Sequence, residues 1–226
     1  MQSWGVTTKK GDTLYAHVHH WPKSGMLTVG GLTSEIGKAW IVSDPQKKRV
    51  SFSRINDKDM AVHLPANAPD TMNTVIAFAL KKTEKAYPVR LLDDTGDNIL
   101  FTFDAELMGT GLRFGDGKIN RNYVTNWKTD DQWMRWKVRI NKPSKYDLFL
   151  DYNTAGDADT GEVIFNIGGE NFRVNYPAHP EKKGTNSIFI GRIELTKDEV
   201  ECSLRGKNYQ GNQFLNPIAV RFVKTP

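Results

Sequence analysis

Cysteine is nearly absent from this chain of 226 residues, and three other features are scarce or missing. Cys202 is the one cysteine, so no disulfide can form within the chain. No apolar run approaches the roughly 20 residues that a membrane-spanning helix needs, so a membrane is not an expected partner. The N-terminus lacks the basic-then-apolar pattern of a secretory signal peptide. Helical periodicity is almost absent, which excludes a mainly helical fold.

Apolar residues instead alternate with polar ones at period two, and turn signals separate short runs, as in an all-β protein. The expected strands of the first part are 14–18, 26–29, 39–42, 50–53, 60–64 and 75–80. Those of the second part are 99–103, 133–140, 146–152, 163–167, 172–176, 188–195, 200–204 and 218–223. This pattern predicts two antiparallel β-sandwich domains, the second a jelly roll.

The stretch KKTEKAYPVR at 81–90 differs from its surroundings. It is charged, contains a proline and lacks a strand pattern, which is typical of a domain boundary. The expected division is therefore a first domain at 1–82, a linker at 83–90 and a second domain at 91–226.

The formal net charge of +5 makes nucleic acid a partner to consider. The basic residues are spread, however, and the densest run is Lys47, Lys48 and Arg49. A solvated turn is the favoured interpretation of this run, because no nucleic-acid-binding motif accompanies it. Nucleic acid is therefore not an expected partner, although binding driven by the basic charge stays open as an alternative.

Several spaced pieces of the first part resemble one known domain. They are WGVTTKKGDTLYAHV at 4–18, the pair Trp21-Pro22, KAWIVSD at 38–44 and LPANAPDTMNTVIAF at 64–78. Together they are similar to the C-terminal β-sandwich that follows the catalytic barrel in family 29 glycoside hydrolases, the α-L-fucosidases. The barrel, which carries the nucleophile and acid of that family, is not part of this sequence.

Residues 98–226 resemble a family 6 or 35 carbohydrate-binding module, a β-jelly roll. The matching pieces are FDAE at 103–106, DDQWMRWKV at 130–138, PSKYDLFLDY at 143–152, VIFNIGGE at 163–170 and LNPIAVRF at 215–222. The resemblance implies sugar contact by Asn216. It also implies a structural calcium ion at Glu106, but Ile218 stands where the second ligand, an aspartate, would be. No other cofactor is expected.

Sugar binding requires flat aromatic rings against which a pyranose packs, with a few polar groups to bind its hydroxyls. Tyr123, Trp127 and Tyr209 lie near turn signals and, with Asn216, form the candidate carbohydrate-binding set. For Trp127 a core position is slightly favoured over a sugar-binding one, and both interpretations stay open. The strand setting of Trp133 and Trp136 favours core or half-buried positions for both.

Two other patterns suggest metal ligands. His17 and His19 share one strand face, but zinc needs further ligands and none is identifiable nearby, so packing or surface roles are favoured. The loop at 156–162 offers Asp157, Asp159 and Glu162, but it departs from a calcium loop and is interpreted as a solvated turn. No metal-binding residue is therefore assigned.

No catalytic residue is assigned either. A retaining glycosidase needs two opposed carboxyl groups about 5 to 5.5 Å apart, and neighbouring pairs such as Asp93-Asp94 are a poor basis for that arrangement. The leading hypothesis is a noncatalytic accessory region of an α-L-fucosidase-like glycoside hydrolase, with the catalytic barrel and a glycan, fucosylated glycans included, as partners. The parent protein is expected in the periplasm or outside the cell. A free-standing glycan-binding protein is the alternative.

Overall fold

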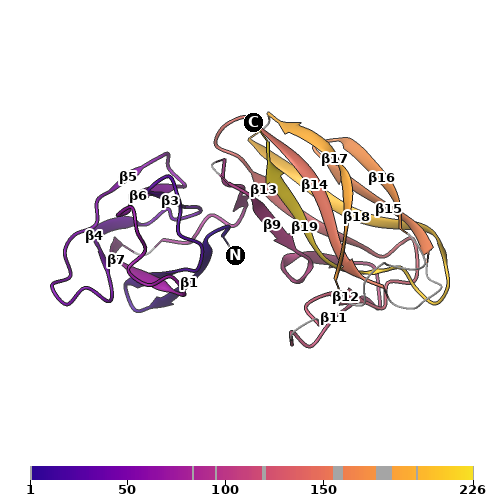
Figure 1. Ribbon diagram of the computed structural model, residues 1–226, viewed down its shortest axis with the longest axis horizontal. Coiled ribbons are helices and arrows are strands. Elements are labelled where there is room, and N and C mark those ends of the chain that lie inside the picture. Colours follow the sequence, from indigo (N-terminus) through magenta and orange to yellow (C-terminus); the bar gives the residue numbers. More distant parts are fainter. Residues whose placement is uncertain are drawn as a thin grey trace. The chain divides into compact units, whose positions relative to one another are not determined.

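Two compact units, Met1–Thr95 and Gly96–Pro226, make up the chain in the computed structural model (Figure 1). The structure describes residues 2–82, 84–94, 96–118, 121–154, 160–176, 185–196 and 198–225. Apart from one 3-10 helix, η1 (Thr102–Asp104), the described elements are strands. The predicted all-β class with two antiparallel sandwiches is confirmed. None of the described residues forms a helix long and apolar enough to cross a bilayer.

The first unit is a sandwich of two small sheets. One has the strand order β1-β2-β7-β4 and the other β3-β6-β5. The bounds are β1 Gly5–Lys10, β2 Thr13–Val18, β3 Met26–Val29, β4 Glu35–Ile41, β5 Phe52–Arg54, β6 Met60–His63 and β7 Thr74–Lys82. Val18, Ile76 and Phe78 from the first sheet pack against Leu27 and Val62 from the second, and all five are buried. The alternation seen in the sequence is thus the division between core and solvent.

A buried carboxylate fixes the loop that follows β3. Asp59 has no exposed surface, and its Oδ1 accepts a hydrogen bond of 3.0 Å from the backbone N–H of Gly31. Its Oδ2 accepts from the Asn56 amide at 3.2 Å. Burial of a carboxylate is favourable only with such partners, so Asp59 holds the turn at Gly31 in place.

Residues 84–87, at the centre of the expected linker, are hydrogen-bonded to the loop at 31–34 within the first unit. The Tyr87 N–H donates to the Gly31 carbonyl at 3.0 Å, and the Thr33 hydroxyl donates to the Lys85 carbonyl at 3.0 Å. Gly31 has φ +75°, and a Cβ there would lie 2.7 Å from the Tyr87 carbonyl oxygen. Although its composition is typical of a linker, the segment 84–87 is therefore held against the loop at 31–34 by hydrogen bonds. The domain bounds expected from the sequence stay a prediction.

The second unit is a larger sandwich in which the chain passes repeatedly between two sheets, as in a jelly roll. One sheet has the order β10-β13-β18-β15-β16 and the other β17-β14-β19-β9. The bounds are β9 Asn98–Phe101, β10 Glu106–Met108, β13 Trp133–Arg139, β14 Ser144–Asn153, β15 Thr160–Ile167, β16 Glu170–Tyr176, β17 Asn186–Leu195, β18 Glu199–Gln210 and β19 Asn216–Lys224. The strand expected at 99–103 ends at Phe101, because the chain turns there into η1.

Aromatic rings from both sheets meet in the core of the second unit. Phe165 on β15 and Phe222 on β19 have ring centroids 6.3 Å apart, and Tyr146 on β14 meets Phe222 edge-on at 5.7 Å. All three are buried. Along β14 buried residues alternate with half-buried or exposed ones, so one face is in the core and the other faces solvent.

The paired Asp59 carboxylate leads to a prediction about the first unit. We expect Asp59→Ala to lower the free energy of unfolding by about 1 to 3 kcal/mol, because the Gly31 N–H would be left buried without an acceptor. Urea denaturation measures this change. Asp57→Ala is the matched control, since Asp57 is exposed in the same turn; an equal loss in both variants would contradict the role given to Asp59.

The single thiol leads to a second prediction. Cys202 is fully buried, and this burial raises the pKa of its thiol. The thiolate is the reactive form, so iodoacetamide should leave the native chain unmodified at pH 8 and alkylate it in denaturant. Mass spectrometry measures both; rapid alkylation of the native chain would show that Cys202 is not held in the core.

Candidate functional site

The four candidate sugar-binding residues come from segments at one end of the second unit. At this end β14 and β18 finish, β13 and β19 begin, and the hairpin of β11 (Arg113–Phe114) and β12 (Val124–Thr125) extends (Figure 1). Tyr123 precedes β12 and Trp127 follows it, while Tyr209 is the next-to-last residue of β18 and Asn216 begins β19. Because neighbouring strands are antiparallel, segments far apart in sequence meet at this loop end.

Phe214, two residues before Asn216, contacts the segments that carry Trp127 and Tyr209. Its ring centroid lies 5.0 Å from that of Trp127 and 4.6 Å from that of Tyr209, both in tilted contact. The Phe214 N–H donates to the Trp127 carbonyl at 2.8 Å. Gly206 on β18 makes room for the ring, since a Cβ there would lie 2.6 Å from it. Sequence reasoning missed Phe214. The signal that could have identified it is an aromatic residue directly after the turn at 211–213.

Trp127 is a core residue in this structure. Its side chain is fully buried, and the indole N–H donates to the Gln132 carbonyl at 2.8 Å. The Gln132 side chain in turn accepts from the backbone N–H groups of Lys128 and Thr129. Trp127 therefore presents no exposed ring face to a sugar. The sequence left a sugar-binding position and a core position open for Trp127, and the structure shows the core position.

The other candidates lie in the segments that flank this aromatic cluster. Asn216 is almost buried, and its Oδ1 accepts a 2.7 Å hydrogen bond from the Gln213 amide. The same amide lies 3.4 Å from the Thr125 hydroxyl. Tyr123, Tyr209 and Gln213 are half-buried, so part of each residue is at the surface. We call Tyr123, Tyr209, Gln213 and Asn216 the loop-end site. Sequence reasoning missed Gln213, for which no motif or pattern was a signal.

The two tryptophans of β13 have the positions predicted for them. Trp136 is buried, and its indole N–H donates to the Phe101 carbonyl at 3.0 Å. Trp133 is half-buried on the outer face, where the Arg205 guanidinium lies 3.9 Å from its ring centroid. That cation covers one face of the ring, so Trp133 is a poor platform for a sugar.

Calcium at the position implied by the resemblance does not fit the residues present. The Glu106 carboxylate accepts two hydrogen bonds from Arg135, at 3.0 and 2.6 Å. A fixed guanidinium thus takes the place that a cation would need, and Ile218 is buried and supplies no oxygen.

The remaining metal candidates have other partners or lie outside the described residues. His17 is hydrogen-bonded to the Thr8 hydroxyl at 2.9 Å, and His19 to the Met72 carbonyl at 3.3 Å. Glu162 pairs with Arg173 at 3.1 Å. Asp157 and Asp159 lie outside the described residues, and the described ones contain no group of three or more histidines, cysteines and acids placed to hold a metal ion.

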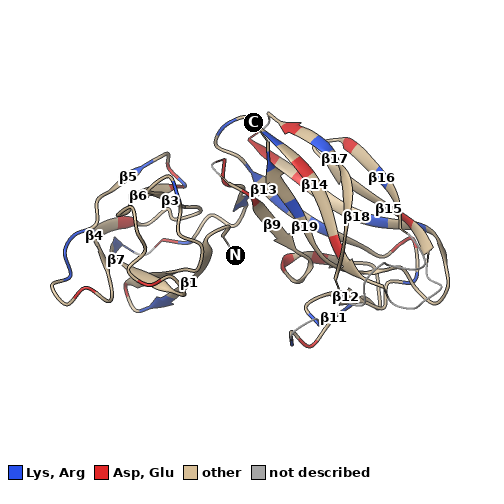
Figure 2. Cartoon of the chain, in the orientation of Figure 1, with Lys and Arg blue, Asp and Glu red and all other residues tan. Residues whose placement is uncertain are grey.

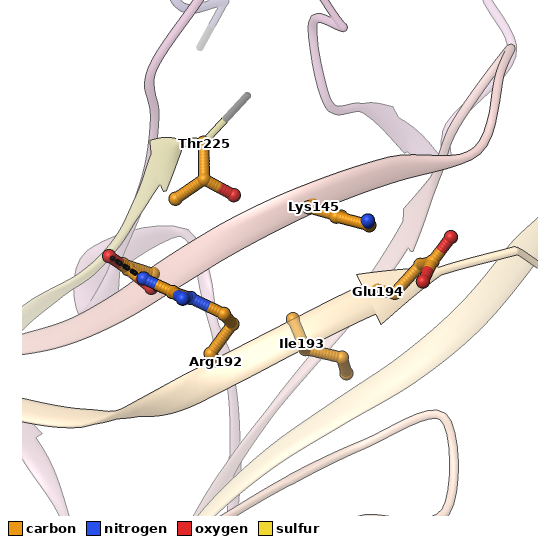
Figure 3. Close-up of a pocket in the computed structure, with 6 residues that line it drawn as sticks. Lys145, Arg192, Ile193, Glu194 and Thr225 are labelled. Atoms are coloured by element: carbon orange, nitrogen blue, oxygen red, sulfur yellow. Dashed lines mark hydrogen bonds and ion pairs between the residues drawn. The ribbon is translucent and has the colours of Figure 1, made fainter.

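A groove of about 630 Å³ lies at the opposite end of the same sandwich, between β14 and β17 (Figure 3). Lys145, Asp147, Arg192, Glu194 and Thr225 line it. The Arg192 guanidinium donates to both carboxylate oxygens of Asp147, at 2.7 and 3.1 Å, and this hydrogen bonding lowers the pKa of Asp147. The groove lining contains no aromatic ring, so the groove alone lacks a platform for a sugar.

Charges of both signs are interspersed over the described strands (Figure 2). Arg221 pairs with Asp151 at 2.7 Å, as Arg135 does with Glu106 and Arg192 with Asp147. The basic run Lys47–Arg49 is exposed in a turn in which Asp44 accepts from the Lys48 N–H, as predicted for a solvated turn. This arrangement differs from the one-sided basic surface typical of nucleic-acid-binding proteins.

Comparison with known proteins identifies the first unit's relatives. The family described as alpha-L-fucosidase C-terminal domain matches residues 2–83. The sequence-based resemblance of this part to the fucosidase domain is thereby confirmed. No curated protein matches the chain.

Solved structures extend the likeness of fold to both units. An α-L-fucosidase from Vibrio sp. strain EJY3 is similar with a TM-score of 0.61 and 15% identity. The likeness covers 98% of this chain, which spans only 40% of the length of that fucosidase.

Two other solved structures are similar at lower TM-scores. A Podospora anserina GH26-CBM35 β-(1,4)-mannanase has a TM-score of 0.46 and 17% identity, over 59% of this chain and 28% of the mannanase. The CBM36-1 domain of a multidomain xylanase from the hindgut metagenome of Trinervitermes trinervoides has 0.47 and 13%, over 57% of this chain and 98% of that domain.

The contact between Gly206 and Phe214 leads to a prediction about the loop end. We expect Gly206→Ala to lower the free energy of unfolding of the second unit by about 1 to 3 kcal/mol, because Trp127 and Tyr209 prevent the Phe214 ring from moving aside. Gly96→Ala is the matched control, since a Cβ there meets no atom within 4 Å. Thermal unfolding of the two variants measures this difference. Equal unfolding midpoints would show that the aromatic cluster can move to accommodate the added methyl group, and would contradict the prediction.

Proposed function

We propose that this chain is a noncatalytic region of an α-L-fucosidase-like glycoside hydrolase. The observation that carries the proposal is the likeness to the Vibrio α-L-fucosidase, whose fold similarity runs through both units, together with the family match at residues 2–83. In this proposal the first unit supports a catalytic domain and the second binds glycan. The parent protein acts in the periplasm or outside the cell.

An outward face of the first unit supports the docking role. On the sheet β1-β2-β7-β4, Tyr15 and Trp40 flank Ala77 across three neighbouring strands. Both aromatic residues are half-buried, and Val42, just beyond β4, is 45% exposed. Apolar side chains on the outer face of a sheet favour contact with another folded domain.

The loop-end site supports the binding role. Tyr209 and Tyr123 offer aromatic surface, and Gln213, held by Asn216, offers an amide to sugar hydroxyls. Trp127 and Phe214 lie beneath and fix the geometry rather than contact the sugar. A weak site of this kind raises the local concentration of glycan beside a tethered catalytic domain, without catalytic residues of its own.

The same geometry fits a free-standing glycan-binding protein, which is the second candidate. Both candidates predict no turnover of an aryl fucoside by this chain. They differ in the strength of glycan binding that the isolated chain needs: a free-standing lectin must bind tightly alone, whereas a tethered module needs only weak binding.

An oligosaccharide array tests the binding role. We expect the isolated chain to bind neutral oligosaccharides, fucosylated ones among them, and Tyr209→Ala to weaken binding about tenfold through loss of aromatic stacking. Tyr15→Ala is the control, a half-buried tyrosine of the first unit. Absence of all glycan binding would contradict the binding role, and salt-sensitive binding of DNA instead would favour the nucleic-acid alternative.

A further inference from the structure

An irregularity in β17 turns an aromatic side chain out of the core. In the pairing of β14 with β17, Leu148 lies opposite Gly191 but Phe149 lies opposite Phe189, so Ile190 is an extra residue, a β-bulge. Strict alternation from Arg192, which faces solvent, would direct Phe189 toward the core. The bulge instead places Phe189 on the solvent face together with Arg192, and such bulges often re-aim a side chain beside a functional site.

Phe189 and Phe149 form an open aromatic surface on this face. Phe189 is 52% exposed although it lies in the middle of a strand. The two rings meet at 62° with centroids 5.4 Å apart. The Arg221 guanidinium lies 5.1 Å from the Phe149 centroid and fixes that ring from the other side. A ring held in this way can pack against a ligand with little loss of side-chain freedom.

Fixed hydrogen-bonding groups lie next to these rings. The Arg221 guanidinium donates to Asp151 at 2.7 Å and contacts the Ser187 hydroxyl at 2.9 Å. Asp151 is opposite Ser187 in the register and two residues from Phe149 on the same face, about 7 Å away. The Asp151 and Ser187 oxygens can therefore accept from hydroxyls of a sugar that packs on Phe189.

The charges of this face indicate a neutral ligand. Arg221 is neutralised by Asp151, and Arg192 by Asp147. The groove of Figure 3 continues the face along β14 and β17 from Phe149 to Asp147 and Lys145, and it has room for further sugar units. Both guanidinium groups are thus paired with a carboxylate, and Lys145 lies opposite Glu194 in the register, so the charges of this face balance.

We propose that this outer face of β14, β17 and β19 is a second glycan-binding surface, for a neutral pyranoside chain packed on Phe189. It rests on the proposed function, in that the second unit binds glycan, but it is separate from the loop-end site. We call Phe149, Phe189, Asp151, Ser187 and Arg221 the sheet-face site.

Calorimetric titration of the whole chain with the best neutral oligosaccharide from the array tests the proposal. We expect two sites per chain, of which Phe189→Ala removes one or weakens it at least about tenfold. The matched control is Phe114→Ala, because Phe114 is 48% exposed in the same unit. Thermal midpoints should be unchanged in Phe189→Ala, since its ring is largely outside the core.

The outcomes separate this proposal from the proposed function. If Phe189→Ala leaves the titration unchanged while Tyr209→Ala abolishes binding, the sheet-face site is overturned and the proposed function stands. If Phe189→Ala alone abolishes binding, the sheet-face site stands and the loop-end site is wrong. Absence of binding in the wild type overturns both. Selective binding of sialylated glycans, or self-association that Phe189→Ala removes, also overturns the sheet-face site.

Discussion

Burial of one face of each long strand against a second sheet is the constraint on which the rest of this structure depends. On β14, Tyr146, Leu148 and Leu150 are in the core, and this fixes Asp147, Phe149 and Asp151 on the outside. A one-residue slip would exchange the two sets, so the register cannot drift. Binding groups can therefore lie only on the outer sheet faces or in the loops at the two ends.

Both candidate sites arise where regular strand geometry is interrupted. At the loop end, Asn126 and Asn208 have positive φ, Asn126 directly before Trp127 and Asn208 at a register shift near the end of β18. Trp127 and Tyr209 follow these two positions, and both of their rings contact Phe214. On the sheet face, the bulge at Ile190 exposes Phe189. Regular strands supply rigid support, and the irregular positions choose which side chains meet solvent.

The same division explains why noncatalytic binding is the function best supported. The carboxylates beside the sheet-face site are bound to guanidinium groups: Asp151 to Arg221 and Asp147 to Arg192. A pair of carboxyl groups for glycoside hydrolysis needs different environments that separate their pKa values. Each of these two carboxylates is instead hydrogen-bonded to a cation, and the bond from Arg192 lowers the pKa of Asp147. Such pairs suit the recognition of hydroxyl groups.

Local pattern alone determined the fold class and most strands of this protein. Period-two alternation predicted the bounds of β13 and β14 to within one or two residues. It could do so because alternation reflects which side chains of a strand face the core and which face solvent. It could not foresee that β9 ends at Phe101, because that depends on the turn into η1. Nor could composition show that 84–87 bond to 31–34, since those contacts join distant segments.

Tertiary structure decided the candidate sites. The sequence placed Tyr209 and Asn216 near turns, but the burial of Trp127 depends on Phe214, which is 87 residues away (214 − 127). The exposure of Phe189 depends on a bulge that exists only in the pairing with β14. Side-chain alternation is a local property that sequence records, whereas exposure of a particular ring is set by distant partners that only the folded chain brings together.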